Sequence, residues 1–202
     1  MSNHPKCEKT LVIIKPDGIQ RGLIGEIIKR YERTGLKLVA LKMLVPTSDL
    51  IEKHYLIDPL WKEKVGKKSI EAYKNKGLNP PSEDPLEVGE MVLEKLKKYM
   101  TCGPVIAMVF EGVNAVGVVR KITGATEPLI SDVGTIRGDF TIDSYALADA
   151  DGRAVRNLIH ASSSIEDAEK EIKLWFKDEE IINYRLIQEE ILYDVNLDKI
   201  LE

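Results

Sequence analysis

Two kinds of apolar pattern alternate along the chain: unbroken runs, and apolar residues at helical spacing. The unbroken, β-branched runs at 10–15, 36–45 and 105–110 predict buried strands, each bounded by glycine or proline. A fourth, short strand is predicted at 157–159, ending at His160. Apolar residues three and four apart predict helices that begin near Leu23, Ser48 and Asn114. The resulting order is β-α-β, a helical stretch, then β-α-β.

This order is typical of the α+β ferredoxin-like fold, a split β-α-β arrangement in which helices cover one face of a four-stranded antiparallel sheet. Residues 59–101 are polar and predicted to be helical, with Asp84-Pro85 starting a helix whose apolar stripe is expected to serve packing. Residues 124–157 lack periodicity, and a loop of that length is usually functional. With 202 residues, we expect a single domain over 1–202 that carries an extra helical insertion.

Composition and charge exclude several classes of protein. The net charge of -4 argues against a dedicated nucleic-acid-binding protein. The longest apolar runs are about six residues, far short of the roughly 20 that a membrane-spanning helix needs. The N-terminus has no apolar signal core, so a cytoplasmic location is expected. Cys7 and Cys102 lack paired spacing and are predicted to be free thiols, with Cys102 buried.

The stretch R-N-L-I-H-A-S-S-S at 156–164 carries the most informative histidine. Ser164 and Asp167 have the spacing of a capping box, and apolar residues follow at helical intervals. We therefore expect His160 where a strand gives way to a helix N-terminus, a position at which unpaired N–H groups and the helix dipole favour an anion. On this stretch alone, a half-buried histidine that only hydrogen-bonds to the backbone is the favoured interpretation.

Three basic residues extend this hypothesis. Lys15 ends the first predicted strand, Arg120 lies on the predicted helix at 114–122, and Arg137 lies in the glycine-flanked G-T-I-R-G-D-F. Lysine offers a point charge and arginine a bidentate donor to phosphate oxygens. If they converge with Thr126 near His160, they would form a polyphosphate pocket. Each alone also fits a side chain directed into solvent.

Several stretches together resemble one known family: K-P-D-G-I-Q-R-G-L-I-G-E-I-I-K-R, H-Y, G-A-T-E-P, G-T-I-R-G-D-F and N-L-I-H-A-S. Their order and most of their spacing are similar to the nucleoside diphosphate kinases. The resemblance implies a ping-pong reaction that moves the γ-phosphate of a nucleoside triphosphate such as ATP to a nucleoside diphosphate through a phosphohistidine at His160. It also implies Mg²⁺ carried by the nucleotide phosphates without a dedicated protein site, nucleoside tri- and diphosphates as partners, and a homo-oligomer, either hexamer or tetramer.

The same resemblance assigns roles to individual residues. His160, Lys15, Glu171 and Asn157 would form the catalytic set, with Glu171 hydrogen-bonding the second imidazole nitrogen and Ser162 contacting Glu171. The substrate-binding set comprises Lys15, Tyr55, Arg120, Thr126 and Arg137 for the phosphates, Asn157 for the ribose, and Leu96 for the base. Since the base is held by apolar contact, broad base tolerance is expected.

Departures from the family pattern leave other functions open. Ser163 stands where the family usually has an aspartate, and Val92 stands where an aromatic residue commonly stacks on the base. Two segments, at about 60–90 and 144–153, are longer than in short members of the family. A nucleotide-binding regulator with little turnover is one alternative. A nucleic-acid-binding module on the same sheet is a second, opposed by the net charge and by the scarcity of aromatic residues on the central strands.

Overall fold

A four-stranded antiparallel sheet forms the centre of the protein, and its strand order is β2-β3-β1-β4. The computed structural model describes residues 8–193. Its strands are β1 (Glu8–Ile14), β2 (Lys37–Leu44), β3 (Val105–Gly112) and β4 (Ile159–Ala161). This topology confirms the predicted ferredoxin-like fold.

Helices make up most of the remaining structure. In chain order the α-helices are α1 (Pro16–Gln20), α2 (Ile24–Glu32), α3 (Ser48–Tyr55), α4 (Trp61–Asn75), α5 (Pro85–Thr101), α6 (Ala115–Thr123), α7 (Ile136–Phe140), α8 (Tyr145–Ala150), α9 (Ile165–Trp175) and α10 (Glu189–Leu192). Within residues 8–193, none of the helices has the length and apolar character needed to traverse a bilayer.

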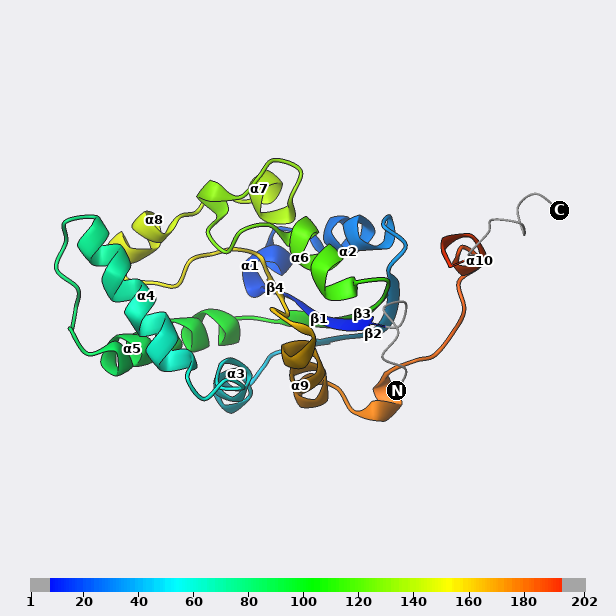
Figure 1. Cartoon of the computed structure of the whole chain (residues 1–202), viewed down its shortest axis with the longest axis horizontal. Coiled ribbons are helices and arrows are strands. Elements are labelled where there is room, and N and C mark those ends of the chain that lie inside the picture. Colours follow the sequence, from blue (N-terminus) through cyan, green and yellow to red (C-terminus); the bar gives the residue numbers. More distant parts are fainter. Residues whose placement is uncertain (1–7, 194–202) are drawn as a thin grey trace.

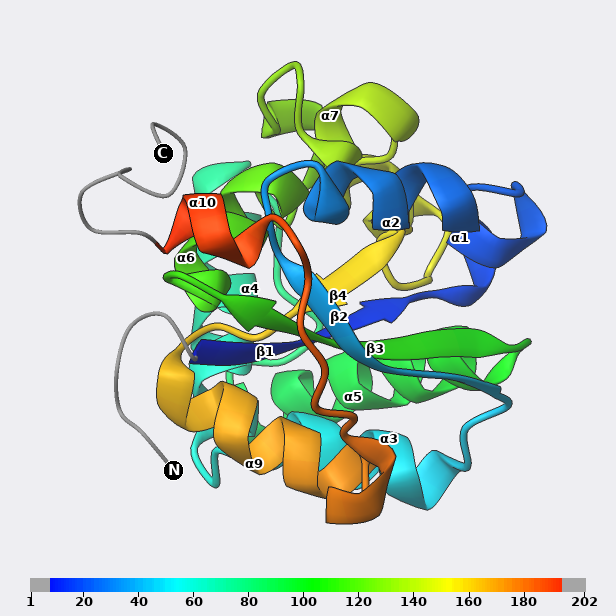
Figure 2. The same ribbon diagram turned by 90° about the vertical axis from the view of Figure 1, so that its right-hand side faces the viewer.

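Helices cover both faces of the sheet, where the sequence predicted one. Val12 and Ile14 of β1 join a core cluster beneath α2 and α6, whereas Leu11 and Ile13 join a second cluster with Trp175 of α9. Figure 2 shows the two layers, with α1, α2 and α6 on one side of the sheet and α3, α5 and α9 on the other. A strand buried on both faces needs apolar residues at every position, which explains the unbroken run in β1.

Several element boundaries differ from prediction for local reasons. Pro16 begins α1 at its first position, where its missing N–H costs no hydrogen bond, so the expected turn is a short helix. The N-cap of α3 is Thr47, one residue before the predicted Ser48, and its hydroxyl accepts from the Leu50 N–H at 3.2 Å. Cys102 is exposed, contrary to expectation, whereas Cys7 lies outside the described residues.

Helices α4 and α5 form a hairpin that extends from one end of the sheet, which we call the helical arm (Figure 1). Their backbones touch at two glycines. A Cβ on Gly66 would lie 1.8 Å from the Pro85 carbonyl oxygen, and a Cβ on Gly89 would lie 2.2 Å from the Lys62 carbonyl oxygen. Because a side chain at either position would force the helices apart, the two glycines fix the spacing of the arm.

Two segments without a predicted strand or helix, 124–157 and the described residues from Asp178, contain regular structure or pair with the sheet. Residues 124–157 contain α7 and α8, so they are not a structureless loop. The C-terminal segment from Asp178 runs along β2, where the Ile182 N–H donates to the Val39 carbonyl at 2.8 Å and the Tyr184 hydroxyl donates to the Leu38 carbonyl at 2.7 Å. These bonds satisfy part of the open edge of the sheet.

Candidate active site

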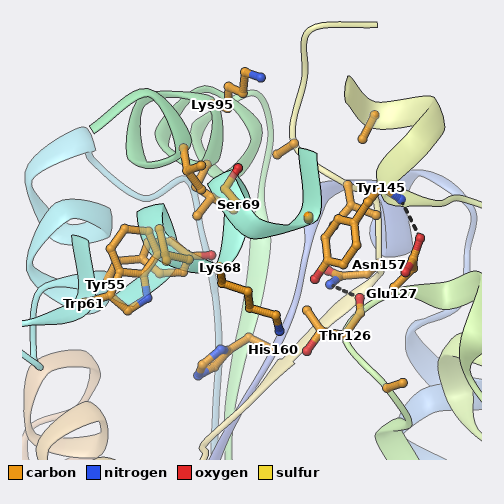
Figure 3. A pocket seen from close by; sticks show the side chains of 18 of the residues that line it. Tyr55, Trp61, Lys68, Ser69, Lys95, Thr126, Glu127, Tyr145, Asn157 and His160 are labelled. Carbon is orange, nitrogen blue, oxygen red and sulfur yellow. Dashed lines mark hydrogen bonds between the residues drawn. The ribbon is translucent and has the colours of Figure 1, made fainter. Parts of the chain in front are cut away.

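One cavity of about 1190 Å³ lies between the helical arm, the loop after α6, α8 and the end of β4. Figure 3 shows side chains from these elements pointing toward it. All residues assigned a catalytic or substrate-binding role from the sequence line it, namely Lys15, Tyr55, Leu96, Arg120, Thr126, Arg137, Asn157, His160 and Glu171. The convergence that the sequence left conditional is therefore present in the structure.

His160 is held at the base of the cavity by Glu171. Its Nε2 atom lies 3.1 and 3.0 Å from the two carboxylate oxygens, and Ser162 donates its hydroxyl to the same carboxylate at 2.6 Å. Burial alone would raise the pKa of Glu171, but the charge and hydrogen bond of His160 lower it to about 2. An ionised carboxylate only accepts hydrogen bonds, so Nε2 carries the proton and a neutral His160 has its lone pair on Nδ1.

A second histidine lies against the first. The rings of His54 and His160 meet edge to face with centroids 4.4 Å apart, and the Trp175 indole N–H donates to His54 Nδ1 at 3.2 Å. Burial, followed by the charge of His160, lowers the pKa of His54 to about 3, so its ring is neutral. Nitrogen and oxygen atoms of His54, His160 and Glu171 lie within 4.8 Å of one another, a spacing that could suit a metal. The hydrogen bond from Trp175 to His54 and the bonds between His160 and Glu171 already engage all three groups.

Lys15 and Asn157 lie beside the base of the cavity, and both are buried. The Lys15 ammonium donates to Asn157 Oδ1 at 2.6 Å, and Asn157 Nδ2 donates to the Thr126 carbonyl at 2.9 Å. Burial and the charge of Arg137 lower the pKa of Lys15 to about 7, with Asp17 opposing the shift. An anionic ligand would favour the protonated form, so Lys15 is poised to gain charge when phosphate arrives.

The backbone between Asn157 and His160 is strained. Leu158 has φ +65°, a left-handed conformation that costs a non-glycine residue about 1–2 kcal/mol. Its N–H donates to Asp17 Oδ2 at 3.2 Å, and its carbonyl accepts from the Lys15 N–H at 2.8 Å. These bonds hold the kink, which is why β4 begins at Ile159 and not at the predicted residue 157.

The two predicted arginines differ in how many donors are free. Arg137 is buried and gives four hydrogen bonds to the carbonyls of Gly124, Ala125, Asn157 and Ile159. Arg120 is exposed and, among the residues that the structure describes, makes one long hydrogen bond, 3.4 Å, to the Ser162 carbonyl. Arg137 therefore ties the loop after α6 to the β4 segment and keeps one N–H for a ligand, whereas most donors of Arg120 face the cavity unused.

The comparison with known proteins decides the family. A model of the nucleoside diphosphate kinase family matches residues 8–72 and 86–181. The chain belongs to the nucleoside diphosphate kinase family. The unmatched residues 73–85 cover the end of α4 and the link to α5.

Relatives match along most of their length. The nucleoside diphosphate kinase of Pyrobaculum aerophilum is 48% identical over 179 residues, which cover 87% of this chain and 98% of that protein. Its crystal structure matches with a TM-score of 0.85 and covers 88% of this chain and all of that one. A transition state mimic of the enzyme from Borrelia burgdorferi, with bound vanadate and ADP, matches with a TM-score of 0.76 at 40% identity, covering 93% of this chain and 98% of that one.

One departure from the nucleoside diphosphate kinase pattern has a neighbour that offsets it. Ser163 replaces the usual aspartate, but its hydroxyl donates to the Asp167 carboxylate one helical turn further on. Asp167 also lines the cavity. A carboxylate is thus kept at this side of the cavity, and the sequence analysis assigned Asp167 only a capping position.

The other departure concerns the aromatic residues of this nucleoside diphosphate kinase. Val92 lines the cavity as an aliphatic residue, but Trp61, Tyr73 and Tyr145 line it too. The Trp61 and Tyr55 rings lie with centroids 5.2 Å apart, and Figure 3 shows Tyr145 on the wall opposite them. Trp61 and Tyr73 were not predicted because their spacing also fits ordinary helix packing, and Tyr145 was not predicted because it lies in a segment without periodicity. The sequence signal that could have predicted an aromatic cavity wall was Trp61 itself, which lies in the long segment at 60–90.

Proposed function

We propose that this nucleoside diphosphate kinase transfers phosphate through Nδ1 of His160. The observation that carries the proposal is the Glu171 carboxylate bound to Nε2, because it leaves the Nδ1 lone pair for the substrate. Among the hydrogen bonds of residues 8–193 that involve His160, the ring uses Nε2 alone. A neutral imidazole needs no prior deprotonation to attack phosphorus.

The two half-reactions follow from this arrangement. Nδ1 attacks the γ-phosphorus, an N–P bond forms, and the bond to the β-phosphate oxygen breaks to release a nucleoside diphosphate. The proton stays on Nε2, so the phosphorylated ring carries positive charge, which the ionised Glu171 stabilises. A second diphosphate then takes the phosphoryl group by the reverse steps. Ser162 keeps the carboxylate oriented throughout.

Five side chains support phosphate binding in this proposal. Lys15, Tyr55, Arg120, Thr126 and Arg137 would contact phosphate oxygens, with Arg120 as the main bidentate donor because its N–H groups are unused. Asn157 would meet the ribose through the amide N–H that Thr126 leaves free. Phosphoryl transfer depends chiefly on alignment and on neutralising oxygen charge, which suits a cavity rich in fixed donors.

The donor chemistry of the cavity fits Mg²⁺ brought in by the nucleotide. When bound, Mg²⁺ neutralises charge on the phosphates, and it prefers oxygen ligands and water. Ser163 and Asp167 supply a hydroxyl and a carboxylate at the side of the cavity next to His160, so they would hold the waters of the ion. Val92, Leu96 and the aromatic residues would hold the base by apolar contact, which predicts broad base tolerance.

A cytoplasmic homo-oligomer, hexameric or tetrameric, also belongs to this proposal. Leu41, Met43 and Val45 are exposed on the edge strand β2 and the residue that follows it, although the C-terminal segment contacts β2 at Val39 and Lys42. Apolar residues on an open sheet edge favour pairing with another chain. Light scattering at several protein concentrations would measure the oligomer directly.

The decisive experiment uses γ-labelled ATP with Mg²⁺ and no acceptor. We expect an acid-labile phosphoprotein that is discharged by CDP, GDP and UDP alike, and no label on His160→Ala. Label that persists on His160→Ala would assign the nucleophile elsewhere. If the unmodified protein binds nucleotide but takes up no label, the proposed phosphoryl transfer is wrong, and the alternative of a nucleotide-binding regulator with little turnover is favoured.

A further inference from the structure

One face of α4 lines the nucleotide cavity. Trp61, Val65, Lys68, Ala72 and Tyr73 all lie on the cavity wall. Their offsets from Trp61 are four, seven, eleven and twelve residues, which place them on one side of an α-helix. Ser69 and Asn75 add two polar positions to this wall, and Lys68 is the one residue of α4 on it that carries a charge.

The lysines of α4 differ sharply in their partners. Lys62, Lys64, Lys67 and Lys74 pair with Glu90, Asp58, Glu63 and Glu83 respectively. Lys68 has no hydrogen bond or ion pair within residues 8–193, and Figure 3 shows its side chain reaching from α4 into the cavity toward the side of Thr126 and His160. An ammonium group that faces a cavity and is not paired with any of the carboxylates lining it is available to an anionic ligand.

The helical arm holds this lysine in a defined place. The backbone contacts at Gly66 and Gly89 leave α4 no room to slide along α5, and Gly66 is two residues from Lys68. Ile70 and Val88 are buried in the arm. The base of the Lys68 side chain is therefore preorganised, while its flexible stem can adjust to the ligand.

The cavity also needs the charge. Arg137 donates four N–H groups to backbone carbonyls. Lys15 is partly neutral near pH 7 in the free protein because its pKa is lowered to about 7. Of the three basic residues predicted from the sequence, Arg120 alone is exposed, and its side chain makes one long hydrogen bond within residues 8–193. A nucleoside triphosphate brings several negative charges, so a further cation on the cavity wall would strengthen its binding.

We propose that Lys68 binds the phosphate chain of the nucleotide, so that the helical arm closes the phosphate site from the side opposite Arg120 and Thr126. The inference rests on the proposed function and assigns to α4 a binding residue for that same cavity. Lys68 is a binding residue and takes no part in proton or phosphoryl transfer.

The test compares Lys68→Met with Lys67→Met. Lys67 is the preceding residue on α4, carries the same charge, pairs with Glu63 and does not line the cavity. We expect Lys68→Met to weaken ADP binding about five- to twentyfold, as for the loss of one partly solvated charge-assisted contact. Lys67→Met should bind as the unmodified protein does, and Lys68→Arg should restore most of the affinity. Calorimetry with ADP measures this without turnover.

Kinetics separate this role from others. KM for ATP should rise in Lys68→Met by a similar factor, with kcat changed less than twofold and phosphohistidine still formed. The loss should be equal for ADP, GDP and CDP, and absent for adenosine. A loss confined to one base would overturn the phosphate assignment, and unchanged ADP affinity would overturn the inference while leaving the kinase intact. An unmodified protein that binds ADP but forms no phosphohistidine would instead overturn the proposed function.

Discussion

The base and the walls of the cavity are built in opposite ways. At the base, Glu171 is 6% exposed and bonded to both His160 and Ser162. On the walls, the ion pair between Lys76 at the end of α4 and Asp149 of α8 spans 3.5 Å, with the two side chains 40% and 36% exposed. Hydrogen bonds at the buried base are strengthened by a low local dielectric, whereas those at the wall compete with water.

This contrast separates chemistry from recognition. A histidine that must present one nitrogen for attack needs a fixed tautomer, which only a buried, fully satisfied partner provides. A wall that must admit many nucleotides and release them needs weaker contacts. Changes at the base should therefore lower kcat, and changes at the walls should mainly alter affinity.

The largest effect is expected at Glu171. Glu171→Gln keeps the size but loses the charge that stabilises the phosphorylated ring, and kcat should fall about 10- to 100-fold with a smaller change in KM. Quenched-flow measurement of phosphohistidine formation gives the rate. Glu169→Gln, an exposed position on the same helix, is the control and should behave normally. A normal rate of phosphorylation in Glu171→Gln would mean that the carboxylate at the base of the cavity does not stabilise the phosphorylated His160.

Local signals in the sequence predicted the elements of the base but not their assembly. Ser164 caps α9 by accepting from the Asp167 N–H at 3.1 Å, as its spacing indicated. The same predicted helix includes Glu171, so the position of Glu171 on α9 was also expected. His54 lies against His160 although 106 positions separate them, and no local pattern encodes such a contact. The family resemblance supplied Glu171 as a partner, whereas His54 and Trp175 as its support came from the structure.

The walls were predicted least well for a physical reason. Trp61, Val65 and Tyr73 have the spacing of a packing stripe, and the same spacing serves a helix that faces a cavity. Whether such a stripe packs against the core or faces a cavity depends on the element opposite it. Here that element is α8, a helix of six residues in a segment without periodicity. Leu158 is another such case, because its left-handed backbone depends on bonds to Asp17 and Lys15.

The next largest effect should arise at Gly66, which positions the wall. Gly66→Ala places a methyl group against the Pro85 carbonyl, and overpacking of this kind lowers the free energy of unfolding by about 1–3 kcal/mol. Urea unfolding measures the loss, and KM for ATP should rise because α4 shifts. Gly25→Ala on α2 meets no atom within 4 Å and should change stability by less than about 0.5 kcal/mol. Equal losses in both variants would contradict close packing in the arm.

A smaller effect connects the two regions through Lys15. We propose that the ammonium form of Lys15 binds phosphate; because the pKa of Lys15 in the free protein is about 7, ADP affinity should then fall as pH rises above about 7. The fall should approach about tenfold per pH unit until the higher pKa of the complex is reached. Between about pH 7.5 and 9 the diphosphate is fully ionised, so its own titration does not interfere.

Proton uptake provides the control for this pH dependence. Calorimetry in two buffers of different ionisation enthalpy should show ADP binding at about pH 8 accompanied by uptake of up to one proton, because the ligand raises the pKa of Lys15. Lys15→Met should bind more weakly and take up none. The same uptake in Lys15→Met would assign the titration to another group.

The smallest effect is expected where α4 and α8 meet. The Lys76–Asp149 pair is exposed, and pairs of this kind contribute about 0.2–1 kcal/mol, which corresponds to at most about a fivefold change in KM. A double-mutant cycle with Lys76→Met and Asp149→Asn, measured on KM for ATP, should give a coupling energy of that size at low salt. At high salt the coupling energy should vanish. A coupling above about 2 kcal/mol, or one that salt leaves unchanged, would show that the pair is shielded from water during binding. The walls would then close over the nucleotide as firmly as the base holds His160, and the contrast between the two regions would apply only to the free protein.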